Sequence, residues 1–164
     1  MISIFNKRQL IILGMMLAAI LVRLLPHPPN VTPVTAIALF GGAFFNDKRL
    51  GLILPLVVMF ISDIFIGFST ISLFVYAALF CISILGQYFK KVNFGSILAS
   101  GIIFFIVSNF GVWIIGYPKT WHGLLECYTL AIPFFRNAII GDFLFSFIMA
   151  YSFLRVEKHY LKTI

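Results

Sequence analysis

Long apolar runs separated by short polar or charged connections dominate the chain. A helix needs about 20 residues to cross about 30 Å of hydrocarbon. Runs bounded by charges, prolines or glycine clusters predict six transmembrane helices, over residues 10–25, 33–45, 50–68, 70–89, 93–116 and 134–154. The second run is the shortest, so it is expected to be tilted little, to begin inside the preceding loop, or to sit in thinned membrane.

Two segments of the chain need a separate interpretation. Residues 118–133 are too short and too polar to form a further span, and they include Trp121 and His122. An interfacial helix on the outer surface is expected there, and an anchor with no further role is the alternative. The run from Leu10 is expected to be a retained first helix rather than a signal peptide, because no A-x-A-like cleavage site follows it.

The positions of lysine and arginine predict the orientation. Cytoplasmic connections carry an excess of these residues. With six spans, nine of them fall on one side, which places both termini in the cytoplasm: Lys7, Arg8, Lys48, Arg49, Lys90, Lys91, Arg155, Lys158 and Lys162. The opposite side receives only Lys119 in a loop, with Arg23 and Arg136 at or near span ends.

Composition supports an all-α fold, a single polytopic membrane domain over residues 1–164. The chain is 62% hydrophobic and 10% charged, whereas soluble domains carry about 25% charged residues. A nucleic-acid partner is excluded despite the net charge of +7, because the basic residues stand singly or in pairs between apolar runs. The lipid bilayer of the inner (cytoplasmic) membrane is therefore the expected surrounding.

Four ionisable residues fall within the spans, and all lie in the outer half: Arg23, Asp63, Arg136 and Asp142. Each costs about 2.5–3.5 kcal/mol on insertion scales, and such groups usually face protein or water. Both arginines have an alternative, since they can extend to the outer headgroups. An ion pair with Arg23 or Arg136 is the alternative for the two carboxylates.

Further polar residues are predicted on the same side. Asn109, Trp113 and Tyr117 recur every four residues and form one stripe along a helix, which suits helix–helix hydrogen bonding or a pocket wall. The first outer loop is rich in proline, carries His27 and Asn30, and is expected to be stiff enough to act as a lid.

Catalytic and cofactor motifs are absent from the sequence. It contains no P-loop, HExxH, GxSxG or cysteine–histidine metal spacing, so we expect no enzyme activity, no cofactor and no metal site. Cys127 is interpreted as an inert, half-buried thiol rather than a soft metal ligand. Because the chain cannot hydrolyse ATP alone, any pumping requires a partner or an ion gradient.

Several strings in the chain resemble an uncharacterised family of small bacterial membrane proteins. These strings are residues 23–30, Thr32-Pro33, residues 38–43, Ser62-Asp63, residues 108–113, residues 117–120, Cys127-Tyr128, residues 131–137 and Gly141-Asp142. The six-span layout is in turn similar to the substrate-binding S components of energy-coupling factor (ECF) vitamin transporters.

The ECF resemblance implies a vitamin-sized ligand bound near the first, third and fifth loops. It also implies toppling within the membrane and partnership with transmembrane and ATPase subunits. A corrinoid ligand would leave Cys127, His27 and His122 as alternative cobalt ligands, and the spacing selects none of them.

The leading hypothesis is therefore the substrate-binding subunit of a small-molecule uptake system with an outward pocket. The alternatives are a non-transporting scaffold or cell-envelope subunit and, third, a small membrane enzyme acting on lipid. The candidate binding residues are Arg23, His27, Asn30, Asp63, Asn109, Trp113, Tyr117, Trp121, His122, Cys127, Arg136, Asn137 and Asp142.

Overall fold

The computed structural model describes residues 6–26 and 28–161, and within these ranges the chain forms helices and no strands. The elements are α1 (Lys7–Leu24), α2 (Val34–Phe44), α3 (Lys48–Ile66), α4 (Ser72–Phe89), α5 (Phe94–Gly116), α6 (Trp121–Val156) and the short π-helix η1 (Glu157–Leu161). The all-helical prediction is confirmed. Among the described residues, four helical segments are long and apolar enough to cross a membrane, namely α3, α4, α5 and Trp121–His159.

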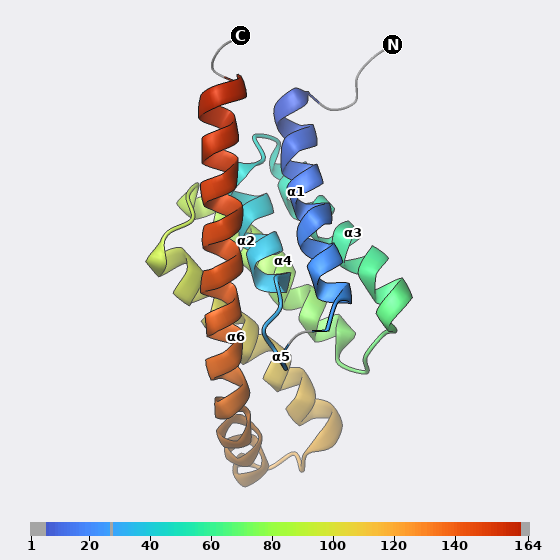
Figure 1. The fold of residues 1–164 in the computed structure, drawn as a ribbon. Helices are drawn as coiled ribbons and strands as arrows, with labels where there is room; N and C mark the ends of the chain where they lie inside the picture. The colour runs from blue at the N-terminus through green and yellow to red at the C-terminus, as the bar shows by residue number, and fades with distance from the viewer. Residues whose placement is uncertain (1–5, 27, 162–164) are drawn as a thin grey trace.

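The helices form one bundle whose connections alternate between its two ends (Figure 1). The start of α1, the α2–α3 connection and η1 lie at the upper end of the view. The connections α1–α2, α3–α4 and α5–α6 lie toward the lower end. We refer to these as the termini end and the loop end.

Helix α2 forms the centre of the bundle. It has 11 residues, of which ten are buried, so it is enclosed on nearly all sides. A helix that is apolar all round is typical of such a position. At 1.5 Å per residue it is about 16 Å long, well short of the roughly 30 Å of hydrocarbon. Burial against protein, rather than a match to bilayer thickness, therefore explains this short apolar helix.

Two glycines let α2 and α4 approach closely. A side chain at Gly42 would overlap the Ser83 carbonyl group, and one at Gly86 would lie 2.6 Å from the Leu39 carbonyl oxygen. Close backbone contact through small residues is common between helices in membranes. Gly14, in a similar small-residue pattern in α1, has no neighbouring atom within 4 Å. The pattern alone therefore does not identify which helix faces pack.

Helix α6 replaces the separate interfacial segment expected over 118–133 with one continuous helix. It begins after Thr120, whose hydroxyl accepts a hydrogen bond from the Gly123 backbone N–H, and it continues through Pro133. Its first turns lie at an angle to the rest of the helix in Figure 1. Proline removes one backbone donor and bends a helix, but here it does not end it. With 36 residues, α6 is about 54 Å long at 1.5 Å per residue.

Arg8 joins three elements at the termini end. Its Nε lies 2.7 Å from Glu157 Oε1 in η1. Its Nη1 donates to the Phe44 carbonyl at the end of α2 and to Asn46 Oδ1. The guanidinium also lies 5.1 Å from the ring centroid of Phe153. These contacts of Arg8 hold α1, the end of α2 and η1 together at the termini end.

Candidate binding site

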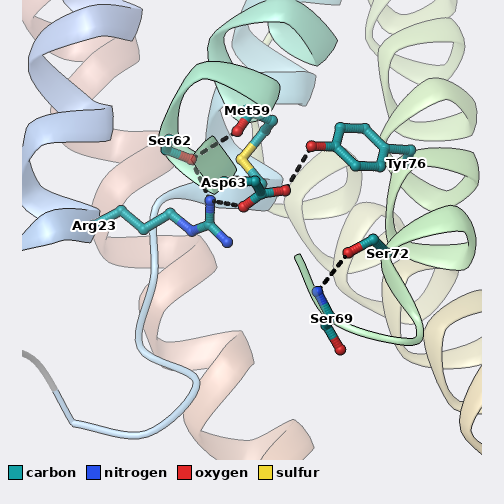
Figure 2. A network of polar contacts seen from close by, with 7 residues as sticks. All are labelled: Arg23, Met59, Ser62, Asp63, Ser69, Ser72 and Tyr76. Atoms are coloured by element: carbon teal, nitrogen blue, oxygen red, sulfur yellow. Dashed lines mark hydrogen bonds and ion pairs between the residues drawn. The ribbon is translucent and has the colours of Figure 1, made fainter. Parts of the chain in front are cut away.

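A buried polar network lies near the loop end of the bundle and links α1, α3 and α4 (Figure 2). Arg23, in the last turn of α1, donates from Nη1 to Asp63 Oδ1 at 2.6 Å and to Ser62 Oγ. The Tyr76 hydroxyl of α4 donates to the other carboxylate oxygen, Asp63 Oδ2, at 2.5 Å. Ser62 in turn donates to the Met59 carbonyl at 2.8 Å. Both oxygens of Asp63 therefore have partners.

The end of α3 places Asp63 in this network. The Gly67 N–H closes the helix by donating to the Asp63 carbonyl, and Gly67 has a φ of +101°. That conformation favours glycine and lets the chain turn directly toward α4. As a result, Tyr76 reaches back across the turn to a carboxylate 13 residues earlier in the sequence.

Asp142 lies in α6 and is 3% exposed. Among the described residues, its Oδ2 atom has no hydrogen-bond partner. The Thr35 side chain of α2 is a neighbour of the carboxyl group. Gly101 of α5 makes room for it, since a side chain there would lie 2.9 Å from Asp142 Oδ2. One turn further along α6, the buried Ser146 hydroxyl also has no partner within the described part of the chain.

A cavity of about 460 Å³ is lined by Arg23 from the polar network and by Asp142. Its lining comes from the end of α1, the α1–α2 loop, the start of α2, the later part of α3, the start of α4, the later part of α5 and the middle of α6. Typical small-molecule sites measure about 300–1,000 Å³ and are mostly apolar, with a few polar groups. The polar side chains at this cavity are Arg23, Asn30, Thr32, Thr35, Ser108, Asn109 and Asp142.

Aromatic rings form much of the remaining wall. Phe104 and Phe105 come from α5, and Phe134 and Phe135 from α6. The rings of Phe105 and Phe135 pack with centroids 4.7 Å apart. Such rings offer flat apolar surface and, through their negative faces, attraction for a cation.

The proline-rich α1–α2 loop runs beside α6. Asn137 donates from Nδ2 to the Pro29 carbonyl at 3.3 Å. A side chain at Gly141 would lie 3.1 Å from the Thr32 backbone nitrogen, so loop and helix are in close contact here. Asn30, with a φ of +63°, lines the cavity from this loop and is itself exposed. The loop is therefore held at the rim of the cavity by α6.

Of the candidate residues predicted from the sequence, Arg23, Asn30, Asn109 and Asp142 line the cavity. Asp63 adjoins it through its ion pair with Arg23. His27 lies outside the described residues. Asn137 is half-buried and holds the α1–α2 loop rather than lining the cavity.

The predicted stripe on α5 divides between two environments. Asn109 lines the cavity, and its Nδ2 donates to the Phe105 carbonyl. Trp113 instead donates from Nε1 to the Pro118 carbonyl, and Lys119 lies 5.8 Å from its ring centroid. Lys119 also donates to the carbonyl of Tyr117. Trp113 and Tyr117 thus form hydrogen bonds that stabilise the α5–α6 turn.

The remaining candidates lie away from the cavity. Trp121, His122 and Arg136 are exposed. Cys127 is 3% exposed, and its thiol donates to the Asn109 carbonyl at 3.5 Å. Among the described residues, no three His, Cys, Asp or Glu side chains lie close enough to hold a metal ion.

Sequence reasoning missed several residues of the network and the cavity. Thr35 and Ser108 are single hydroxyls within apolar runs, where they satisfy backbone groups as often as they bind ligands. Tyr76 had a usable signal, because its phenol occurs in a span and needs a polar partner. The four phenylalanines that line the cavity had no such signal, because nothing in the sequence distinguishes them from the other phenylalanines among the 20 in the chain.

A family model described as a family of unknown function (DUF6580) matches residues 3–163, so the chain belongs to that family. No curated protein and no solved structure matches the chain.

Proposed function

We propose that this member of the DUF6580 family is the small-molecule-binding subunit of a membrane uptake system, with its cavity open to the outside of the cell. The observation that carries the proposal is the cavity itself. The cavity is lined by three of the ionisable and amide side chains that the sequence places within spans: Arg23, Asn109 and Asp142. Polar side chains within spans are costly and usually serve a ligand, an ion path or each other.

The distribution of basic residues supports an outward orientation for the loop end. Arg8 and Arg155 belong to the termini end, and Lys48 and Arg49 begin α3 there. Lysine and arginine accumulate on the cytoplasmic side of membrane proteins. In the proposed arrangement the termini end is cytoplasmic and the cavity faces outward.

The proposed arrangement has six membrane-embedded helices. α1 is apolar between charges at its two ends, Lys7 and Arg8 at one and Arg23 at the other. α2 is too short to cross alone, and we place it inside the bundle, continued toward the outer surface by the α1–α2 loop. Non-helical chain at membrane depth is tolerated where it lies against protein or lines a cavity.

The substrate class and the energy source follow from analogy with ECF S components, a likeness of layout alone. In that arrangement the ligand is vitamin-sized, and separate transmembrane and ATPase subunits drive its uptake. The absence of a nucleotide-binding motif in this sequence supports the need for a partner.

A non-transporting scaffold is the second candidate, and one observation favours it. Asp63 is fully satisfied within the protein by Arg23 and Tyr76. An internal network of this kind holds α1, α3 and α4 together without any ligand.

Co-purification of a ligand tests the proposal. Wild-type protein and an Ala138→Phe variant would be purified in detergent, and bound small molecules identified by mass spectrometry. Ala138 lines the cavity and is half-buried, so phenylalanine there fills the cavity without removing a polar group. Ala18→Phe is the matched control, because Ala18 is exposed on the outside of α1.

We expect the same molecule in wild-type protein and in Ala18→Phe, and its loss from Ala138→Phe. Uptake of that molecule by cells should fall in parallel. A cavity-blocked variant that keeps the molecule, or wild-type preparations that consistently contain none, would favour the scaffold.

A further inference from the structure

Asp142 is the one ionisable group at the cavity without a charged partner in the described part of the chain. Two ionisable side chains line the cavity, Arg23 and Asp142. Arg23 is already bound to Asp63 at 2.6 Å. Arg136, the other arginine predicted to face the site, is exposed and does not line the cavity.

The neighbours of Asp142 do not replace a charged partner. α2 offers the Thr35 hydroxyl, and α5 offers Gly101, which has no side chain. α6 itself offers Ser146, whose hydroxyl is also unpartnered within the described residues. Burying a carboxyl group without enough hydrogen bonds costs free energy. A ligand that donates a hydrogen bond to this group removes part of that cost and gains affinity.

Most of the other residues that line the cavity are apolar or aromatic. Phe104, Phe105, Phe134 and Phe135 lie on the two helices, α5 and α6, that also supply Gly101 and Asp142. A ligand with an ammonium group at one end and a flat apolar body matches this arrangement. The carboxylate would bind the charged end, and the rings would contact the body.

We infer that the cavity binds an amphipathic organic amine, whose ammonium group donates to Asp142 and whose apolar body packs on the phenylalanine rings. This inference rests on the proposed binding function and specifies its ligand class. Arg23 then lines the cavity with its charge already neutralised by Asp63, and it does not bind an anionic group of the ligand.

Three probes with one indole body and different ends test the inference: tryptamine, tryptophol and indole-3-acetate. Thermal unfolding of detergent-purified protein would be followed against the concentration of each probe. The variants are Asp142→Asn and, as a matched control, Glu126→Gln. Glu126 is an exposed carboxylate on the same helix that does not line the cavity.

We expect tryptamine to raise the melting temperature of wild-type protein and of Glu126→Gln in a saturable way. Tryptophol and indole-3-acetate should need at least tenfold higher concentrations. In Asp142→Asn the preference for tryptamine should be lost, while the variant itself stays folded or gains stability because a neutral amide replaces a buried carboxyl group that lacks a hydrogen-bond partner at Oδ2. The comparison between probes on wild-type protein stands even if the variant fails to fold.

A preference for indole-3-acetate, equal effects of all three probes, or no effect of any would overturn the inference. A rise in melting temperature caused by sodium chloride would also overturn it, if potassium chloride and choline chloride have no such effect and Asp142→Asn abolishes it. The site would then bind an inorganic cation. An anionic or neutral molecule that co-purifies with wild-type protein and is lost from Ala138→Phe would contradict the amine while leaving the binding function intact.

Discussion

Arg23 and Asp63 form an ion pair near the loop end, and its contribution to stability depends on both partners being present. The Arg23 side chain is 18% exposed and that of Asp63 6%, so both are largely removed from water. Replacing a buried pair by apolar residues is often neutral, whereas removing one partner leaves an uncompensated charge and costs about 3–5 kcal/mol.

This contrast gives a prediction for a double-mutant cycle. Arg23→Met and Asp63→Leu should each lower the free energy of unfolding by about 3 kcal/mol, toward the lower end of that range because Arg23 keeps some exposure. The double variant should be more stable than either single variant. Chemical unfolding in detergent, followed by circular dichroism, measures all four states.

Arg136→Met is the control for loss of an arginine, because Arg136 is exposed. Its effect should stay within about 0.5 kcal/mol, as is usual for surface substitutions. A double variant that loses as much stability as the two single variants combined would show that the residues do not act as a pair.

At the scale of residues, the sequence predicted that Asp63 and Asp142 lie within helices of the bundle, but not how they pair or that Arg136 is exposed. Asp63 and Asp142 were equivalent as carboxylates within outer span halves, and Arg23 and Arg136 were equivalent as arginines. The choice between them depends on helix rotation and on the α3–α4 turn, which bring Tyr76 and Arg23 to the same carboxylate. A single sequence shows directly neither the rotation of each helix nor the path of the α3–α4 turn.

At the scale of elements, the contact between α2 and α4 organises the bundle. α2 is buried along nearly its whole length, and Gly42 and Gly86 allow its backbone to meet that of α4. Side chains added at such a contact force the backbones apart, and overpacking of this kind typically costs about 1–3 kcal/mol and occasionally more.

Gly42→Ala should therefore destabilise the protein by about 3 kcal/mol, because the new methyl group would overlap the backbone carbonyl of Ser83. Gly14→Ala is the matched control on α1, where the added methyl meets open space. Alanine is also the better helix former, so this variant should be unchanged or slightly more stable. Melting temperatures in one detergent compare the two, and equal losses would contradict the packing described.

The apolar runs predicted the positions of all six helices, but not the length of α6. The bounds of the first five agree with the predicted runs to within a few residues, because charges, prolines and glycines interrupt the apolar pattern where the helices end. The polar character of residues 118–133 indicated a separate segment. Leu124, Leu125, Glu126 and Ala131 are nevertheless good helix formers, and they continue the helix up to and through Pro133.

At the scale of the whole molecule, the two ends of the bundle differ in chemistry. The termini end carries the Arg8–Glu157 ion pair and, at the start of α3, Lys48 and Arg49. The loop end carries the cavity, bordered by the α1–α2 loop and by α4, α5 and α6. This difference agrees with the proposed outward-facing binding subunit, and the sequence predicts it through ionisable residues that lie in one half of the expected spans.

The access of a small thiol reagent to the cavity tests this account most directly. In a Cys81→Ser, Cys127→Ser background, single cysteines at Ala138 and at Lys91 would be treated with a charged, membrane-impermeant methanethiosulfonate. Right-side-out and inside-out membrane vesicles would be compared by mass spectrometry. Ala138 lines the cavity, and Lys91 is exposed in the α4–α5 connection.

The account predicts labelling of Ala138→Cys in right-side-out vesicles and of Lys91→Cys in inside-out vesicles. Labelling of Ala138→Cys from the cytoplasmic side alone, or from neither side, would contradict an outward-facing cavity.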